Sequence, residues 1–309
     1  MISRSDIVAA LNQAGIQRGM TVFSHANIAF FGRIEGVGSM DELVGIMLSA
    51  FADALGPRGT LVLPVFTYSF GSDKAEKVFD VQRSLSATSA MGNWLVTSGR
   101  GVRSADPMLS VVAMGGKAAE LTANIDPICF GSDSIWARLY ADDAVICNLN
   151  IDSGSTYLHW VERELGVPYR FDIPMAGTTI EHGESRSTEI VYTGRSLTDG
   201  GSEARFEAYH QACLAHGVSR QVSLGRGQII VQSARRAKSF LAEQMVHSPR
   251  LLTAGNLKCR KVSWCFTPSH PVSALRCTAG QEISCRFAAA FPAQGCAKLS
   301  ITSKCCCPS

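Results

Sequence analysis

The sequence predicts an α/β protein: a layered α/β/α sandwich with a mixed central sheet, followed by an irregular C-terminal tail. Segments with strand and helix periodicity alternate through residues 1–255, which is typical of layered α/β domains. Beyond them the periodicity fails. The chain has 309 residues, of which 46% are hydrophobic and 18% charged. This is enough to bury a substantial core in one large domain or two smaller ones.

The N-terminal part contains a helix, a strand, a second helix and a second strand, in that order. Apolar residues at helical spacing predict a helix at residues 5–14, which Gly15 ends. Residues 21–25 are expected to form a short strand, and residues 41–54 a helix with one apolar face. A Gly-Pro turn then leads into residues 60–66, whose β-rich composition predicts a strand buried on both faces.

Later segments continue this alternation. Further strands are expected at residues 109–114, 144–149 and 188–193, and further helices at residues 91–98, 134–140, 156–165 and 203–216. The sequence contains no internal repeat. We therefore assign residues 1–255 to one domain.

Residues 256–309 differ in composition from the rest of the chain. Eight of the eleven cysteines lie between Cys259 and Cys307. From Leu251 onward there are seven Lys or Arg and one acidic residue, whereas residues 1–250 carry 22 basic and 25 acidic residues. A metal-binding tail is the functional alternative, but the cysteine spacing lacks the paired C-x-x-C ligands of zinc sites. We expect a Cys-rich extension that is disordered or aberrant.

The composition also bears on location. The longest apolar stretches, such as residues 59–66, are well short of the roughly 20 residues that span a bilayer. Residues 1–6 lead into an amphipathic pattern and not into the apolar segment of a secretory signal. The cysteines outside the tail, Cys129, Cys147 and Cys213, are isolated, as is usual in a reducing compartment. We therefore expect a cytoplasmic protein.

The segment with the clearest chemistry is STYLHWVE at residues 155–162. On a helix, a spacing of three places His159 and Glu162 on one face. Ser155 or Thr156 is expected to cap this helix, so His159 lies in its first turn, where the helix dipole disfavours the imidazolium. The result is a neutral histidine that accepts a proton, oriented by Glu162 or by a carboxylate from elsewhere. By spacing alone, such a pair is more often a surface ion pair or a semi-buried histidine that is satisfied by its hydrogen bonds.

Three further segments carry recognisable motifs. Residues 22–28 (VFSHANI) are similar to a Val-His-Ser-Ser-Leu loop, and residues 56–67 (GPRGTLVLPVFT) to Gly-Pro-x-Gly-Thr-Leu-Val-Met-Pro-Thr-Phe-Thr. Residues 102–110 (VRSADPMLS) follow Arg-Ser-x-His-Pro-x-x-Ser, and residues 156–162 follow Thr-x-Leu-His-x-x-Glu. In this order the four motifs resemble those of the aminoglycoside 3-N-acetyltransferase family. The resemblance covers about residues 5–255.

The resemblance implies an N-acetyltransferase that uses acetyl-CoA as donor substrate, without a metal, to acetylate an amine of an aminosugar or an aminoglycoside antibiotic. His159 is then the general base and Glu162 its orienting carboxylate. The residues expected at the coenzyme are Ser24, His25, Ala26, Asn27, Arg103, Ser104, Ser110 and Thr156. A thioester is already activated, so direct attack by the amine needs no covalent enzyme intermediate. Backbone N–H groups at residues 24–27, or the Thr156 hydroxyl, are expected to stabilise the oxyanion.

This sequence departs from the family pattern in three places. Ala26 and Asn27 replace two serines, and Asp106 replaces a histidine, so an anionic acceptor stands where the family has a base. Residues 27–33 are more aromatic than in antibiotic-modifying members and resemble relatives associated with surface-sugar biosynthesis, which favours an aminosugar acceptor. The two phenylalanines in this segment can stack on a sugar or belong to the core.

Two functions from other classes stay open. A non-catalytic homologue that binds acetyl-CoA or a sugar is compatible with Asp106 and with the aberrant tail. A serine-type hydrolase also needs a base, but the sequence has no Gly-x-Ser-x-Gly elbow. No basic-aromatic array indicates nucleic-acid binding. The sequence does not specify the oligomeric state.

Overall fold

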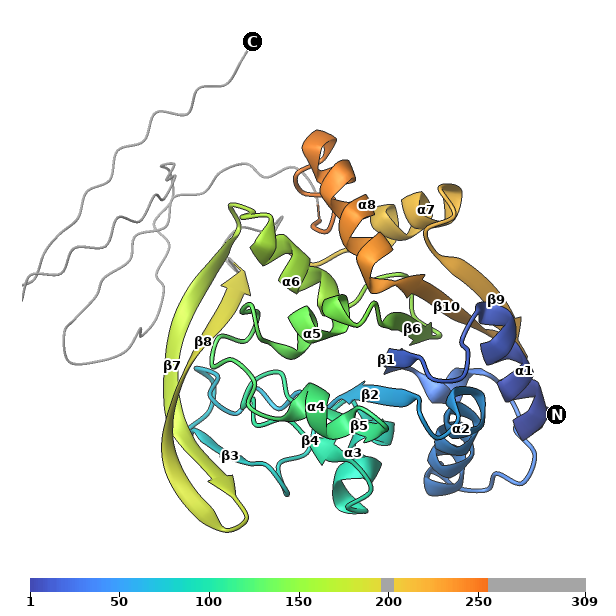
Figure 1. Ribbon diagram of the computed structural model, residues 1–309, viewed down its shortest axis with the longest axis horizontal. Helices are drawn as coiled ribbons and strands as arrows, with labels where there is room; N and C mark the ends of the chain where they lie inside the picture. Colours follow the sequence, from blue (N-terminus) through green and yellow to red (C-terminus); the bar gives the residue numbers. More distant parts are fainter. Residues whose placement is uncertain (196–202, 255–309) are drawn as a thin grey trace, which may run out of the picture. The chain divides into compact units, whose positions relative to one another are not determined.

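The computed structural model describes residues 1–195 and 203–254 (Figure 1). The chain divides into two compact units, of which the larger comprises Met1–Arg195 and Arg205–Leu252 and contains all the helices and strands named below. The extension expected at residues 256–309 lies outside the described residues, so the predicted domain boundary stays a prediction.

A seven-stranded mixed sheet forms the centre of the larger unit, with the strand order β4-β5-β2-β1-β6-β10-β9. β1 pairs in parallel with β2 and with β6, whereas the other neighbouring strands are antiparallel. The strands are β1 (Thr21–Ala26), β2 (Thr60–Pro64), β4 (Val102–Arg103), β5 (Val111–Gly115), β6 (Val145–Leu149), β9 (Arg220–Leu224) and β10 (Gly227–Ser233).

Helices cover both faces of this sheet. Successive strand residues point to opposite sides, and the apolar side chains on each side pack in a hydrophobic cluster under helices. On β1, Phe23 packs in one hydrophobic cluster and Val22 in the other. Phe31 belongs to the Val22 cluster, whereas Phe30 is 61% exposed. The helices on the Val22 side are α1 (Arg4–Ala14), α2 (Met40–Leu55) and α3 (Ala90–Thr97). Those on the Phe23 side are α4 (Ala118–Thr122), α5 (Ile135–Ala141), α6 (Tyr157–Glu164), α7 (Glu207–Ala215) and α8 (Ala234–His247). The predicted α/β/α sandwich with a mixed sheet is confirmed.

A second, three-stranded sheet has the order β3-β7-β8. β7 (Arg170–Glu181) and β8 (Glu184–Arg195) form a long antiparallel hairpin, and β3 (Val78–Asp80) pairs in parallel with β7. The hairpin is the yellow-green ribbon pair in Figure 1. Its open end, where Arg170 pairs with Arg195, follows soon after α6 and so lies near the residues predicted for catalysis.

Most of the expected elements are present with small changes at their ends. The expected helices at 5–14, 41–54, 91–98 and 134–140 correspond to α1, α2, α3 and α5 within one residue at each end. The strand expected at residues 60–66 ends earlier, at Pro64, and the helix expected from residue 203 begins at Glu207. Among the described residues, no helix combines the length and apolar character needed to cross a bilayer. The cytoplasmic location stays a prediction.

Candidate active site

His159 lies on α6 with a carboxylate on the same helical face. Its Nδ1 atom is 2.8 Å from Oε2 of Glu162. The side chain of His159 is 18% exposed and that of Glu162 is 1% exposed. The spacing of three therefore brings the two side chains together as a helix requires. This is a mostly buried pair, unlike the surface ion pair that the same spacing also allows.

The start of α6 differs from the expected side-chain cap. Thr156 occupies the N-cap position without a side-chain hydrogen bond, and Ser155 Oγ instead accepts a hydrogen bond from Tyr157 N at 3.3 Å. Burial is the largest cause that lowers the pKa of His159, and the charges of Arg170 and Arg195 add to it, outweighing Glu162, which raises it. Burial, more than the helix start, therefore keeps His159 neutral.

Glu162 is the centre of a buried hydrogen-bond network that the sequence did not reveal. Its Oε1 accepts from the hydroxyl of Tyr169 at 2.7 Å, and its Oε2 accepts from Nε of Arg170 at 2.6 Å. Burial on its own raises the pKa of Glu162, but His159, Arg170 and Tyr169 together hold this pKa below its ordinary value. Glu162 is therefore an ionised carboxylate, to which neutral His159 donates through Nδ1.

A second histidine, His25, lies beside this pair at the carboxyl end of β1. The backbone N–H of Thr156 donates to His25 Nε2 at 3.3 Å, which joins residues 131 positions apart in the sequence. The His25 ring packs edge-on against Phe23 and Phe66, with centroids 5.0 and 6.2 Å apart. Burial, with a smaller effect from His159, lowers the pKa of His25 to about 4. Two neutral histidines therefore lie close together at this edge of the sheet.

The other residues predicted at the end of β1 differ in their exposure. Ala26 is partly exposed and Asn27 is exposed, whereas the side chain of Ser24 is fully buried. The backbone N–H of Asn27 donates to the carbonyl of Leu149, at the end of neighbouring β6, at 2.9 Å. The structure thus gathers His25, Ala26, Asn27 and Thr156 at the carboxyl ends of parallel strands, where open α/β sheets bind ligands.

Arg103, Ser104 and Ser110 make internal contacts. The Arg103 guanidinium donates to Ser110 Oγ and to the carbonyl oxygens of Val65, Val81 and Ser84. Ser110 Oγ donates to the Val65 carbonyl at 2.7 Å, and Ser104 Oγ accepts from a backbone N–H of β5 at 3.0 Å. These contacts tie β4 to the segments after β2 and β3. Direct contact of these three side chains with the coenzyme stays a prediction.

Asp106, which stands where the family has a histidine, stabilises a tight turn. Its Oδ1 accepts from the backbone N–H groups of Met108 and Leu109 at 2.8 and 2.9 Å, and from the Cys129 thiol at 3.6 Å. Burial raises the pKa of Asp106, and these hydrogen bonds partly oppose the rise. The carboxylate therefore serves the turn that leads into β5.

Aromatic rings surround the two histidines. Phe130 and Phe206 lie beside His159, with ring centroids 6.4 and 5.8 Å from that of the imidazole. On the His25 side, Phe66 contacts Tyr68 at 6.3 Å. Tyr68 is 43% exposed and has a φ of 49°, a left-handed conformation that is rare for a bulky residue. Such strain often marks functional sites, and the exposed ring offers an apolar face for stacking.

A buried polar cluster that sequence reasoning missed supports the loop between β6 and α6. Ser153 Oγ lies 2.9 Å from His210 Nδ1 and 2.9 Å from Ser219 Oγ, and Gln232 Nε2 donates to the Ser153 carbonyl at 2.8 Å. Ser153 is fully buried, so it is not placed as an accessible nucleophile. Within residues 1–195 and 203–254, no group of three or more His, Cys, Asp or Glu is arranged to hold a metal ion.

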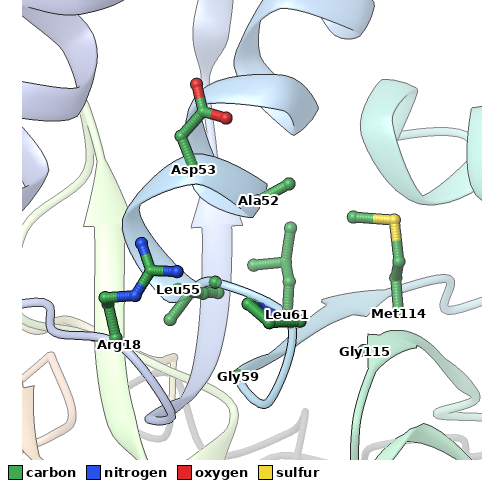
Figure 2. Close-up of a pocket in the computed structure, with 10 residues that line it drawn as sticks. Arg18, Ala52, Asp53, Leu55, Gly59, Leu61, Met114 and Gly115 are labelled. Carbon is green, nitrogen blue, oxygen red and sulfur yellow. The ribbon is translucent and has the colours of Figure 1, made fainter.

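A surface depression of about 520 Å³ lies at the opposite edge of the sheet (Figure 2). It is found near the start of β1 and β2, whereas His25 lies near the carboxyl end of β1. The depression contains none of the predicted site residues. It is lined by Arg18, Ala52, Asp53, Leu55, Gly56, Pro57, Gly59, Leu61, Met114 and Gly115. We therefore place the candidate active site around His159, where ionisable groups converge.

The same fold occurs in solved acetyltransferase structures. AAC-VIa bound to sisomicin is 20% identical, with a TM-score of 0.67 over 80% of this chain and 98% of that one. AAC-IIIb in a binary complex with CoASH is 21% identical, with a TM-score of 0.66 over 80% of this chain and 97% of that one. At these identities the likeness shows the fold alone.

Sequence comparison identifies the family. A family model of aminoglycoside 3-N-acetyltransferases matches residues 25–246, well over half of the chain. The chain belongs to the aminoglycoside 3-N-acetyltransferase family, as the four motifs implied. Aminoglycoside N(3)-acetyltransferase III of Pseudomonas aeruginosa is 30% identical over 179 residues, which cover 52% of this chain and 63% of the relative. The chain thus spans less than two thirds of that relative's length.

Proposed function

We propose that this protein transfers the acetyl group of acetyl-CoA to an amino group of an aminosugar or an aminoglycoside, with His159 as general base. The observation that carries the proposal is the mostly buried His159–Glu162 pair, with Nδ1 and Oε2 2.8 Å apart. It is supported by the family match, which includes this pair. The names of the relatives, one solved with CoASH and one with sisomicin, agree with the donor and with an amine acceptor.

The pair is suited to accept a proton. Because Nδ1 of His159 donates to Glu162, the lone pair of the neutral ring is on Nε2. An ammonium or attacking amine at Nε2 gives up a proton to form an imidazolium, which the adjacent carboxylate stabilises. Tyr169 and Arg170 fix the orientation of that carboxylate by their own hydrogen bonds.

The acceptor binds, in this proposal, among the rings around His159. Partly exposed Phe206 and exposed Tyr68 offer apolar surfaces that stack on the faces of a sugar ring, and buried Phe130 supports the His159 ring from the core side. The acetyl donor, which is a substrate and not a resident group, meets the strand ends at His25, Ala26, Asn27 and Thr156. These positions fit a thioester. They lie beside the proposed base, at the carboxyl ends of parallel strands, which is where open α/β sheets usually bind ligands.

Thiol release from acetyl-CoA tests the proposal. The purified full-length protein is assayed with acetyl-CoA alone, with an aminoglycoside, and with a nucleotide-linked aminosugar. Release that requires one amine class supports the transferase and identifies its acceptor. Release without any amine indicates a hydrolase instead. Coenzyme binding by calorimetry without turnover on any amine indicates a non-catalytic homologue.

His159→Ala is the matched variant for this assay. The thiol release of the transferase is expected to fall in the variant, while its affinity for acetyl-CoA stays near that of the wild type. Near-normal turnover would refute the assignment of His159 as the base without refuting acetyl transfer itself.

A further inference from the structure

Resting on the proposed acetyl transfer, we infer that the Nδ1–H group of His25 binds the thioester carbonyl oxygen and stabilises the oxyanion formed there. His25 then has a catalytic role of its own, distinct from the proton transfer by His159. The inference depends on the hydrogen bond that sets the tautomer of His25, on the packing of its ring, and on the donors around it.

The tautomer of His25 follows from its partner. A backbone N–H can only donate, so the 3.3 Å contact with Thr156 N makes Nε2 of His25 an acceptor without a proton. The proton of the neutral ring is therefore on Nδ1. Among the described residues, Nδ1 of His25 has no hydrogen-bond acceptor. His25 as a residue is partly exposed, at the carboxyl end of β1, and in this inference its Nδ1–H is the donor that the ligand meets.

Packing holds the ring in place before any ligand arrives. The ring lies edge-on to Phe23, with an interplanar angle of 84°, and to Phe66, with an angle of 71°. His25 itself is in register with Asn148 of β6, inside the parallel part of the sheet. A fixed donor needs no reorganisation when charge develops, which is what makes such groups effective in catalysis. The low pKa of His25, about 4, keeps the ring neutral at neutral pH, and the bond from Thr156 N–H selects the tautomer.

Several backbone donors near the site are already engaged. The N–H groups concerned and their acceptors are Asn27 with the Leu149 carbonyl, Tyr157 with Ser155 Oγ, His159 with the Thr156 carbonyl, and Thr156 with His25. The sequence had indicated backbone N–H groups at residues 24–27, or the Thr156 hydroxyl, for the oxyanion. The N–H of Asn27 is engaged, and His25 Nδ1–H is a further donor at this edge, on a ring that packing holds in place.

In the proposed step, the amine nitrogen forms a bond to the thioester carbon while the C=O π electrons move to oxygen. This oxyanion accepts the hydrogen bond from His25 Nδ1–H, and Nε2 of His159 takes the proton from the amine nitrogen. The C=O bond then reforms and the C–S bond breaks, so the thiolate leaves with the electron pair. The imidazolium of His159 gives its proton to that thiolate, and His25 is unchanged.

Two isosteric variants separate this role from a structural one. In His25→Gln, the amide oxygen takes the place of Nε2 and accepts from Thr156 N–H, but no donor stands at the Nδ1 position. In His25→Asn, the amide nitrogen replaces Nδ1 as donor, and the bond to Thr156 is lost. Thermal unfolding, acetyl-CoA affinity by calorimetry, and kcat for thiol release are measured for both.

We expect kcat of His25→Gln to fall about 10²–10³-fold with little change in Tm or acetyl-CoA affinity, as when one oxyanion donor is removed. His25→Asn is expected to unfold at a lower temperature yet keep kcat within about tenfold of the wild type. If kcat falls further in His25→Asn than in His25→Gln, the bond to Thr156 and not the Nδ1–H donor matters, and the inference is overturned. A wild-type protein without acetyl transfer would instead overturn the proposed function on which it rests.

Discussion

Replacing Glu162 by Gln should reduce both stability and catalysis. The substitution keeps the shape of the side chain but leaves the guanidinium of Arg170, which is only 6% exposed, without its anionic partner. Breaking a buried ion pair in this way costs about 3–5 kcal/mol. At roughly 2–4 °C per kcal/mol for a domain of this size, Tm should fall by about 6–20 °C. The measurement is thermal unfolding of Glu162→Gln against the wild type.

The same variant tests the electrostatic role of the carboxylate. A neutral amide does not stabilise an imidazolium, so kcat should fall about 10²–10⁴-fold, the range of general-base catalysis. Since Glu162 raises the pKa of His159 while burial and Arg170 lower it, the acidic limb of the pH–rate profile should move to lower pH. Acetyl-CoA affinity should stay near that of the wild type.

The double variant Glu162→Gln, Arg170→Met separates the two effects. It removes the uncompensated cation, and the Gln oxygen still accepts from the Tyr169 hydroxyl, so most of the lost Tm should return. The value of kcat should remain at least about 10²-fold below the wild type, because no anion faces His159. Recovery of kcat together with Tm would show that Glu162 only holds the fold, and our account of the base would be wrong.

Three further predictions concern other residues of the site. His159→Ala should lower kcat about 10²–10⁴-fold, and wild-type kcat/KM should rise with pH through a pKa below 6.5 and then level off; a flat profile across that range would exclude His159 as the base. Asp106→Asn keeps an oxygen for the backbone N–H groups of Met108 and Leu109. The pKa of Asp106 in the folded protein is raised above 3.8, so the wild type loses stability as pH rises from 3.8 through that folded-state pKa. The variant should therefore have a higher Tm than the wild type at pH 7, and the difference should vanish below about pH 3.8. Arg103→Lys replaces a guanidinium fork that Lys does not reproduce, and it should lower the unfolding free energy by at least about 1.5–3 kcal/mol in urea titrations; an unchanged midpoint would refute the structural role.

The sequence predicted several elements in which the period of the apolar residues is unbroken, although α8, whose buried residues also follow helical spacing, was not expected. Helices α1, α2, α3 and α5 and strands β1, β5 and β6 were expected, because their buried side chains repeat at helical or strand spacing. β7 was not expected: Pro174 and Gly177 interrupt its pattern, and most of its residues are at least partly exposed. The pairing of β7 with β8 over 12 residues, which no local pattern encodes, makes it a strand.

The candidate site was predictable only where its residues are close in sequence. His159 and Glu162 share a helix, so their contact follows from helical geometry. The bond between His25 and Thr156 depends on β1 lying beside β6, which is a property of strand order. Arg103 is the opposite case. It is a charged residue in a family motif, yet the contacts that the structure shows for its guanidinium include backbone carbonyl oxygens of the same protein. A motif alone does not distinguish these cases.

The segment between β6 and α6 connects these observations. From the end of β6, Asn148 Nδ2 donates to the carbonyl oxygens of Asp152 and Gly154 at 2.5 and 2.6 Å, and Ser153 is held by the buried cluster around His210. Thr156 is then bound by His25. These bonds join the segment that leads into α6 to β6, α7 and β1, so the position of His159 depends on all three elements. Because a misplacement of about 1 Å can reduce a rate about 10²-fold, these distant contacts are expected to matter to the proposed acetyl transfer as much as the proposed base does.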